Sequence, residues 1–256
     1  MLNGEKINEI EQAIEKILIK KITTYSPETN NMPFHFRLLG RDRMALFSFI
    51  HSLNTSFGTS IFEPVAETLA KINYPYAQRQ YVVGNEISGE AHKEIQNIIN
   101  ELSVSGCPNK IAEITRIQRL CRKGNTNKLK VVKADLFIKD TNNKVHLIDI
   151  KTTKPNISNF KDFKRTLLEW VAIYLHQYPK AKINTYIAIP YNPYEPKPYE
   201  RWTLKGMIDL KNELMVAKEF WDFLGGEGAY EKVLDCFERV GVRLRPKLDE
   251  YFSKFK

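Results

Sequence analysis

The sequence has 256 residues, of which 43% are hydrophobic and 27% charged, a composition typical of a globular protein with a sizeable core. It contains no run of eighteen apolar residues and no signal-like N-terminal pattern, so we expect neither a membrane span nor a secretory signal. The three cysteines and five histidines are scattered, which argues against zinc binding and favours a cytoplasmic protein with reduced thiols. Basic residues outnumber acidic ones by nine, and this surplus suits a polyanionic partner such as DNA or RNA.

The first part of the chain is dominated by helical patterns. Isoleucines at helical spacing between residues 5 and 22 predict an amphipathic helix. The following segment, 23–43, is rich in proline, glycine and asparagine, and it predicts an extended loop with a basic end. We expect three further helices and one short strand before residue 105, namely helices at 43–54, 60–72 and 88–103 and a strand at 79–84.

The middle of the chain contains the clearest strand patterns. Residues 131–138 and 145–152 are apolar, β-branched runs separated by the polar turn DTNNK, which predicts a β-hairpin. A helix is expected at 159–175, followed by a mostly apolar strand at 183–190. The segment before this hairpin, 105–130, combines glycine and proline with many basic residues, and no helix or strand is predicted within it.

The last part of the chain begins with a segment of four prolines and three tyrosines, 190–202, which predicts a loop. Two helices separated by GGEG at 225–228 complete the sequence. No internal repeat or interdomain linker is evident, so we expect one α/β domain over residues 1–256. Its expected parts are an N-terminal helical and basic arm, a core, and a loop with C-terminal helices, at 1–58, 59–190 and 191–256.

The predicted hairpin brings two aspartates together. If Lys139 lies opposite Val145, then Asp135 lies opposite Asp149, with Cβ atoms about 5 Å apart. Two carboxylates so placed need a cation or a raised pKa, and Mg²⁺ is a cation that takes oxygen ligands. Lys151 lies two residues beyond Asp149 and therefore points to the same face of the strand. A register shifted by one residue would instead separate the two aspartates.

An Asp-x-Lys triplet by itself is also common on solvent-facing strands. Here it follows a strand that carries a further aspartate and precedes a basic helix, in a chain of net charge +9. Together these features predict a metal-dependent site that acts on a polyanion.

The pattern Asp135…Asp149-Ile150-Lys151 resembles the PD-(D/E)XK nuclease signature, with Ala134 in place of the usual proline. The stretches FHFRLLGRDRMALFSFIHSLN, SFGTSIFEPVAETLA, DIKTTKPN followed by FKRTLLEW, and EFWDFLGGEG resemble type II restriction endonucleases of the TdeIII type over most of the chain. The resemblance implies a restriction-endonuclease-like α/β fold, with a central mixed β-sheet flanked by helices and with additional N- and C-terminal helices.

The resemblance also implies an activity and its residues. Such nucleases make Mg²⁺-dependent, site-specific double-strand breaks and leave 5′-phosphate and 3′-hydroxyl ends, and Mn²⁺ is a candidate substitute metal. Asp135, Asp149 and the main-chain carbonyl of Ile150 would bind the metal, and Lys151 would orient or help deprotonate the attacking water.

Further site residues come from the resemblance and from the placement of the basic residues. A helix ahead of the hairpin often supplies an extra acid, for which Glu63 is the first candidate and Glu67 the second, although either glutamate also fits an ordinary exposed helix. Basic side chains near the predicted site and in the N-terminal arm are candidates for contacts with DNA phosphates or bases. They are Lys154, Lys161, Lys164, Arg165, Arg41 and Arg43.

Three functions remain open from the sequence. The first is a type II restriction endonuclease acting as a homodimer, because palindromic double-strand cutting needs two active sites, with a partner DNA methyltransferase and a short palindromic site of the GGNCC kind. The second is a structure-selective nuclease of a repair or resolvase type. The third is a non-catalytic DNA-binding protein built on a nuclease fold.

Overall fold

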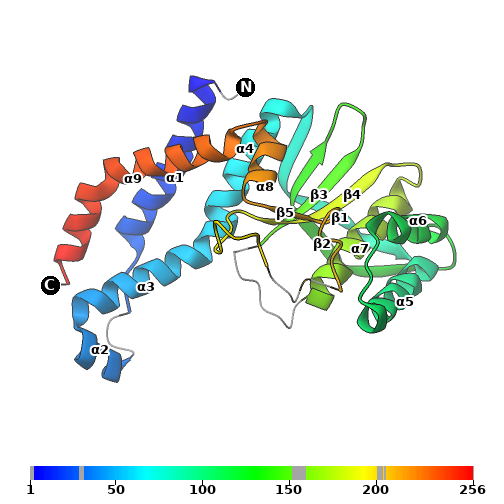
Figure 1. Cartoon of the computed structure of the whole chain (residues 1–256), viewed down its shortest axis with the longest axis horizontal. Coiled ribbons are helices and arrows are strands. Elements are labelled where there is room, and N and C mark those ends of the chain that lie inside the picture. Colours follow the sequence, from blue (N-terminus) through cyan, green and yellow to red (C-terminus); the bar gives the residue numbers. More distant parts are fainter. Residues whose placement is uncertain (1–2, 29–31, 152–159, 201–203, 205, 256) are drawn as a thin grey trace.

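A five-stranded mixed β-sheet lies at the centre of the computed structural model, which describes residues 3–28, 32–151, 160–200, 204 and 206–255 (Figure 1). The strands lie in the order of the sequence. The first three strands pair antiparallel with one another, and the last two continue the sheet in parallel with the third. They are β1 (Tyr76–Ser88), β2 (Thr126–Lys139), β3 (Val145–Ile150), β4 (Ile183–Ile189) and β5 (Leu214–Val216).

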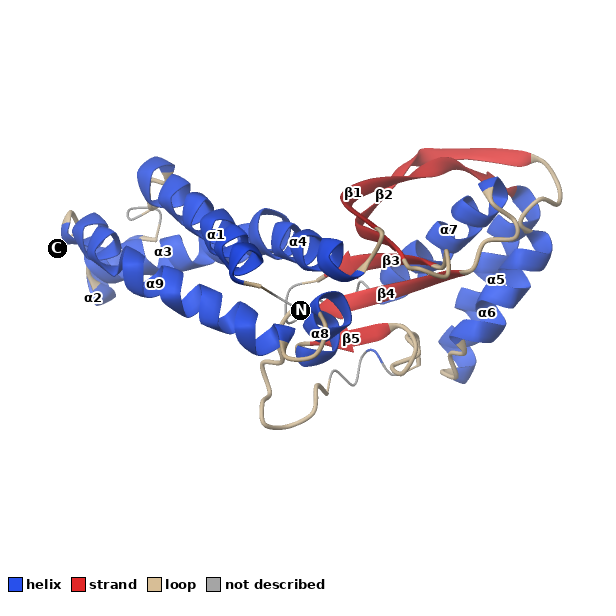
Figure 2. Cartoon of the chain, turned by 90° about the horizontal axis from the view of Figure 1, so that it is seen from above, coloured by secondary structure: helices blue, strands red, loops and turns tan. Residues whose placement is uncertain are grey.

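Helices cover both faces of this sheet (Figure 2). Successive residues of a strand point to opposite faces, and accordingly Leu147 packs in one hydrophobic cluster and Ile148 in the other. The first cluster includes helices α5 (Gly89–Ser105), α6 (Lys110–Leu120) and α7 (Phe160–Gln177). The second includes α1 (Gly4–Thr24), α4 (Glu63–Asn73), α8 (Lys218–Gly225) and α9 (Ala229–Ser253). The predicted α/β class, with a mixed sheet flanked by helices, is therefore confirmed.

Helix α7 forms the crossover that two neighbouring parallel strands require, because it connects β3 to β4. Its apolar stripe packs on the sheet as the spacing predicts, and Phe160, Leu167 and Trp170 are all at least 96% buried. The crossover places the first turns of α7 next to the end of β3, where the side chain of Phe163 lies 5.1 Å from Lys151 Nζ.

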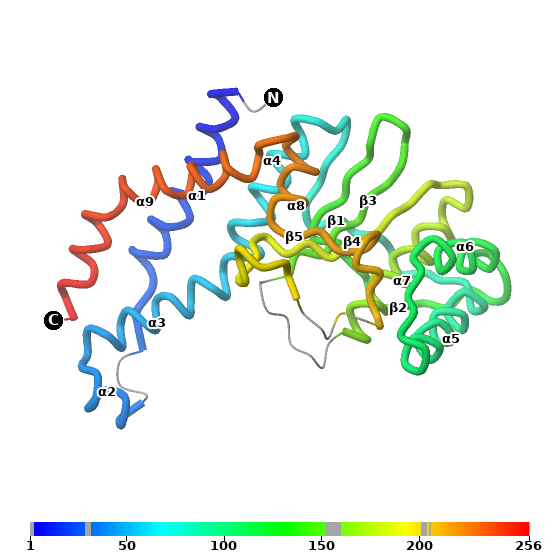
Figure 3. Tube along the Cα trace, viewed as in Figure 1, coloured from blue at the N-terminus to red at the C-terminus, as the bar shows by residue number. Residues whose placement is uncertain are grey.

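Helices α1 and α9, together with three further helical segments, form a helical arm that extends away from the sheet (Figure 3). Helices α1 and α9 pack together through buried side chains such as Ile14 and Val240. Glu11 on α1 also accepts hydrogen bonds from Arg239 and Arg243 on α9, at 2.5 and 2.7 Å. The arm is completed by α2 (Pro33–Leu39), α3 (Arg41–Ser56) and a π-helical segment, η1 (Phe57–Phe62). No helix of the described residues is both long and apolar enough to span a bilayer.

Two segments for which no helix is predicted contain helices. Helix α2 occupies residues 33–39 and begins at Pro33, a residue suited to the first helical position. Helix α6 occupies 110–120, where the side chain of Asn109 caps the helix by accepting from the amide of Ala112. The predicted break between helices at 55–59 is instead bridged by η1, so the chain is helical from Arg41 to Asn73.

Candidate active site

The two aspartates meet where strand β3 separates from β2. Lys139 lies opposite Val145 and Leu136 opposite Ile148, so the predicted register is confirmed, and its continuation places Asp135 opposite Asp149. The amide of Ile150 donates to Asp135 Oδ2 at 2.8 Å. Strand β2 continues beyond this point paired only with β1, which leaves the two carboxylates at the fork.

Asp149 is a buried acid with one cationic partner. Its exposed fraction is 5%, and burial raises the pKa of its carboxyl well above the usual range. The ammonium of Lys151, 2.7 Å from Asp149 Oδ1, opposes that rise, while the nearby charge of Asp135 adds to it. With both carboxyls ionised, the site holds more negative charge than one lysine neutralises.

A third carboxylate, that of Glu63, lies beside this pair at the start of α4. The residue is 2% exposed, and its Oε2 accepts a hydrogen bond from Gln80 Nε2 at 2.8 Å. Burial raises the pKa of the Glu63 carboxyl, and the charge of Asp135 contributes to this rise. Glu67, one turn later, instead pairs with Lys71 and Arg79 at 3.0 and 3.4 Å.

The donor set fits a hard divalent cation. Two adjacent carboxylate side chains supply oxygen ligands of the kind Mg²⁺ prefers, and the burial of Asp149 means that a cation would offset an otherwise costly charge. Within the residues that the structure describes, no three acidic, histidine or cysteine side chains converge into a complete metal site. Water or substrate oxygens would have to complete the ligand shell.

Comparison with known proteins identifies the class to which this arrangement belongs. The sequence model of the HinfI type II restriction endonuclease family matches residues 2–241, nearly the whole chain. The chain belongs to this family. Type II restriction enzymes are site-specific deoxyribonucleases, so the predicted enzyme class is confirmed, and site-specific DNA cleavage is favoured over the two other functions left open by the sequence.

Individual relatives of this endonuclease agree with the family match. The chain is 26% identical to the type II restriction enzyme MjaII of Methanocaldococcus jannaschii, over 98% of this chain and 74% of the relative. It is 24% and 25% identical to the type II restriction enzymes HgiCII and HgiEI of Herpetosiphon aurantiacus, in each case over 86% of this chain and 81% of the relative. The more specific likeness to the TdeIII type stays a prediction.

Among the predicted DNA-contacting residues of the endonuclease, those on α7 differ in their surroundings. Lys161 is exposed, and Arg165 is half-buried and donates to Gln96 Oε1 at 2.7 Å. Lys164 has no exposed surface, and its ammonium is bound by the buried carboxylates of Glu113 and Glu213. The prediction that Lys164 contacts DNA is therefore wrong. Lys154 lies outside the described residues.

The other two predicted DNA contacts belong to the helical arm. Arg41 and Arg43 are exposed on the first turn of α3, and Arg43 donates to the carbonyl of Leu39 at 2.9 Å. Figure 1 shows this end of α3 beside α2, at the end of the arm remote from the sheet. The structure therefore does not bring these arginines together with the aspartate pair.

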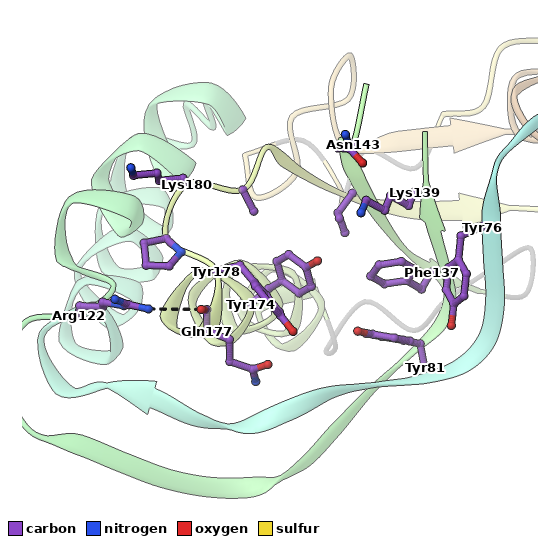
Figure 4. Close-up of a pocket in the computed structure, with 13 residues that line it drawn as sticks. Tyr76, Tyr81, Arg122, Phe137, Lys139, Asn143, Tyr174, Gln177, Tyr178 and Lys180 are labelled. Carbon is purple, nitrogen blue, oxygen red and sulfur yellow. Dashed lines mark hydrogen bonds between the residues drawn. The ribbon is translucent and has the colours of Figure 1, made fainter. Parts of the chain in front are cut away.

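A separate cavity of about 800 Å³ lies at the opposite end of α7. Figure 4 shows its aromatic lining, in which Tyr81 and Phe137 face Tyr174 and Tyr178. None of its lining residues is acidic, so this cavity does not contain the ligands that a divalent metal requires.

The structure adds one residue to the neighbourhood of the site that sequence reasoning missed. Gln80 lies in β1, between Arg79 opposite Leu136 and Tyr81 opposite Ala134, and it contacts Glu63. The predicted strand 79–84 includes this position, but nothing in the sequence indicates the bond to a glutamate seventeen residues earlier.

Proposed function

We propose that this endonuclease cuts both strands of its DNA site by Mg²⁺-dependent hydrolysis that leaves 5′-phosphate and 3′-hydroxyl ends, with Mn²⁺ as a substitute metal. The observation that carries the proposal is the carboxylate pair at the strand fork, in which Asp149 is buried and Asp135 half-buried, with Lys151 Nζ 2.7 Å from Asp149 Oδ1. Such a pair is costly to bury without a cation, and the enzyme class calls for phosphodiester hydrolysis.

In this proposal Asp135, Asp149 and the carbonyl of Ile150 hold the metal. When bound, Mg²⁺ supplies positive charge that lowers the pKa of the attacking water and offsets charge developing on the phosphate. Lys151 keeps its ammonium at the same fork, 31% exposed and open to solvent, where it can donate to the water or to a phosphate oxygen. Glu63 supplies a further acceptor beside Asp135.

The proposal is tested with Asp149→Ala and Lys151→Ala. Each variant should lose roughly a thousandfold or more in cleavage rate, while binding to a DNA fragment in Ca²⁺ changes little. Cleavage of unmethylated phage DNA with and without Mg²⁺ gives the rate, and mapping of the ends gives the product chemistry. Asp235→Asn, an exposed carboxylate on α9, is the matched control, and full activity in either site variant would refute the assignment.

The same proposal includes a homodimer, and the α2–α3 face is the surface that best fits a second copy. Helix α2 buries none of its residues, although helices of this length depend on tertiary packing. The face is defined by seven exposed apolar residues: Met32, Phe34, Leu38, Leu39, Leu46, Phe47 and Ile50. Their exposed fractions add up to about four fully exposed residues, which corresponds to an accessible area on the order of 800 Å². One partner contributes about this area to a stable interface.

A Phe34→Ser, Leu38→Ser double variant tests this surface, because these two side chains are 84% and 82% exposed. Light scattering should show a dimer for the unmodified chain and a monomer for the variant. On supercoiled plasmid the variant should accumulate nicked circles instead of linear DNA. Val104→Ser, which alters another exposed apolar side chain (92%), should behave as the unmodified chain; a dimeric double variant would remove the surface from consideration.

Two biological expectations belong to the same proposal. We propose that a partner methyltransferase protects the host's own sites, and that the recognition site is a short palindrome of the GGNCC kind. Fragment ends mapped on phage DNA give the sequence directly. DNA methylated within that sequence should resist cleavage, and a non-palindromic site would also argue against the symmetric dimer. The single-domain organisation over residues 1–256 likewise stays a prediction.

A further inference from the structure

Gln80 has an unusual backbone conformation for a residue in the middle of a strand. Its φ is +51°, in the left-handed region that favours glycine and that other L-residues adopt at a cost. Two other non-glycine residues of the described chain share this property, Asn143 in the β2–β3 turn and Ala217 before α8. Only Gln80 lies inside a strand that remains paired on both sides.

The strained backbone places this residue at the fork. Arg79 lies opposite Leu136 and Tyr81 opposite Ala134, so Gln80 lies opposite Asp135. Its side chain reaches away from β1 to α4 and donates from Nε2 to Glu63 Oε2 at 2.8 Å. A backbone outlier and a side-chain contact with a buried acid thus occur in one residue, as is found where strain serves a function.

Glu63 needs such a contact in order to stay beside the pair. Its carboxylate is buried next to Asp135, whose like charge repels it. An amide is a neutral donor, so it can fix the orientation of one carboxylate oxygen without adding a cation that would compete with a metal. Glycine at this position would relax the backbone but would supply no donor.

We infer that Gln80 is a positioning residue that holds the Glu63 carboxylate beside Asp135 for catalysis. The inference rests on the proposed role of Glu63 at the active site. Gln80 acts through Glu63 and does not itself touch the reacting phosphate.

The first test compares Gln80→Met, which keeps the length of the side chain but lacks the amide, with the unmodified endonuclease. The kcat for DNA cleavage should fall about tenfold, the scale of one lost hydrogen bond to a charged group, while KM stays within about twofold. Gln78→Met is the matched control, because Gln78 is an exposed glutamine on the same strand, and it should leave both constants unchanged.

The second test separates strain from the hydrogen bond. Gln80→Gly and Gln80→Met both lose the amide and should lose similar activity, but the glycine variant should have the higher melting temperature because it relieves the positive φ. At Gln78, where no positive φ is found, the order should reverse, because glycine weakens an ordinary strand. The same stability order at both positions would contradict the strain.

A double-mutant cycle establishes the route through Glu63. In a Glu63→Ala background, Gln80→Met should change neither the residual cleavage rate nor the rise in melting temperature that Ca²⁺ produces. A full additional loss would show that Gln80 acts elsewhere, and an effect of Gln80→Met on KM alone would make it a DNA contact. If Asp149→Ala is inactive while Gln80→Met is fully active, only this inference fails; an active Asp149→Ala would overturn the proposed site itself.

Discussion

Replacement of Lys164 by methionine should destabilise the protein strongly, because this lysine belongs to a buried ionic cluster. Its Nζ lies 2.5 Å from Glu113 Oε2 and 2.6 Å from Glu213 Oε2. Lys110 binds the other oxygen of Glu213 at 2.7 Å and also donates to Thr185. All five residues are at least 96% buried. Methionine fills much of the same space, but it leaves two buried carboxylates facing one ammonium.

Breaking a buried ion pair from one side costs about 3–5 kcal/mol. For a chain of this size each kcal/mol lowers the melting temperature by roughly 2–4 °C, so Lys164→Met should melt about 10 °C lower in calorimetry. Lys161→Met is the control, because this exposed neighbour on α7 should change stability by less than about 0.5 kcal/mol. Adding Glu113→Gln to Lys164→Met removes one of the two carboxylates that would otherwise share the ammonium of Lys110, and it should recover part of the loss.

The same variants separate burial from DNA contact. A lysine that neutralises a DNA phosphate contributes about 0.9 to the slope of log affinity against log salt concentration. If Lys161 makes such a contact, its variant should lose about that much of the slope, whereas Lys164→Met should retain the slope of the unmodified endonuclease. A Lys164→Met protein that melts normally and binds DNA with a shallower slope would refute the buried cluster.

Three further changes have clear expected outcomes. Burial lowers the pKa of His146, so below about pH 6.5 the folded state binds fewer protons than the unfolded state, and the free energy of unfolding decreases as the pH decreases. In urea titrations from pH 7 to 5, His146→Phe should show a smaller decrease than the unmodified chain. An equal decrease would assign the effect to another group. Asn143 has φ +59°, so Asn143→Ala should cost about 1 kcal/mol in urea unfolding, whereas Asn143→Gly should stay within about 0.5 kcal/mol; equal losses would contradict this backbone conformation. Gly84→Ala should lower the melting temperature, because the new methyl group would lie 2.8 Å from Ile173 Cγ2 at a φ of +144°; an unchanged value would show that β1 relaxes there.

The β2–β3 hairpin could be predicted from the sequence because the residues that determine it lie within one short segment. The polar turn DTNNK fixes the length of the connection, the apolar runs on both sides fix the faces, and together they determine the register. Asp135 and Asp149 are therefore placed opposite one another by residues that lie within one short segment. The buried apolar face of α7 could be predicted for the same reason, since spacing along one helix shows which side chains face the sheet.

The sequence was misleading or silent where residues distant along the chain determine the position of a side chain or the backbone conformation. Lys164 lies four residues after Phe160 and three before Leu167, so its spacing places it on the buried face, whereas its charge suggested the outer face. The buried position is favourable only because Glu113 and Glu213, which are remote in sequence, supply the counter-charges. The positive φ of Gln80 likewise occurs where its neighbours in β1 pair with β2, and no local sequence pattern predicts it.

The packing of α1 against α9 makes completion of the helical arm depend on residues that are far apart in the sequence. Residues near position 10 cover residues near position 240, so α1 cannot pack on α9 until those later residues have emerged from the ribosome. Closing so long a loop has an entropic cost that is offset only when α1 packs against α9. We expect a chain shortened to residue 228 to leave Ile10 and Ile14 open to limited proteolysis, whereas protection of α1 in that fragment would show that it finds another partner first. A protein built this way would complete its helical arm only after the residues near position 240 have left the ribosome.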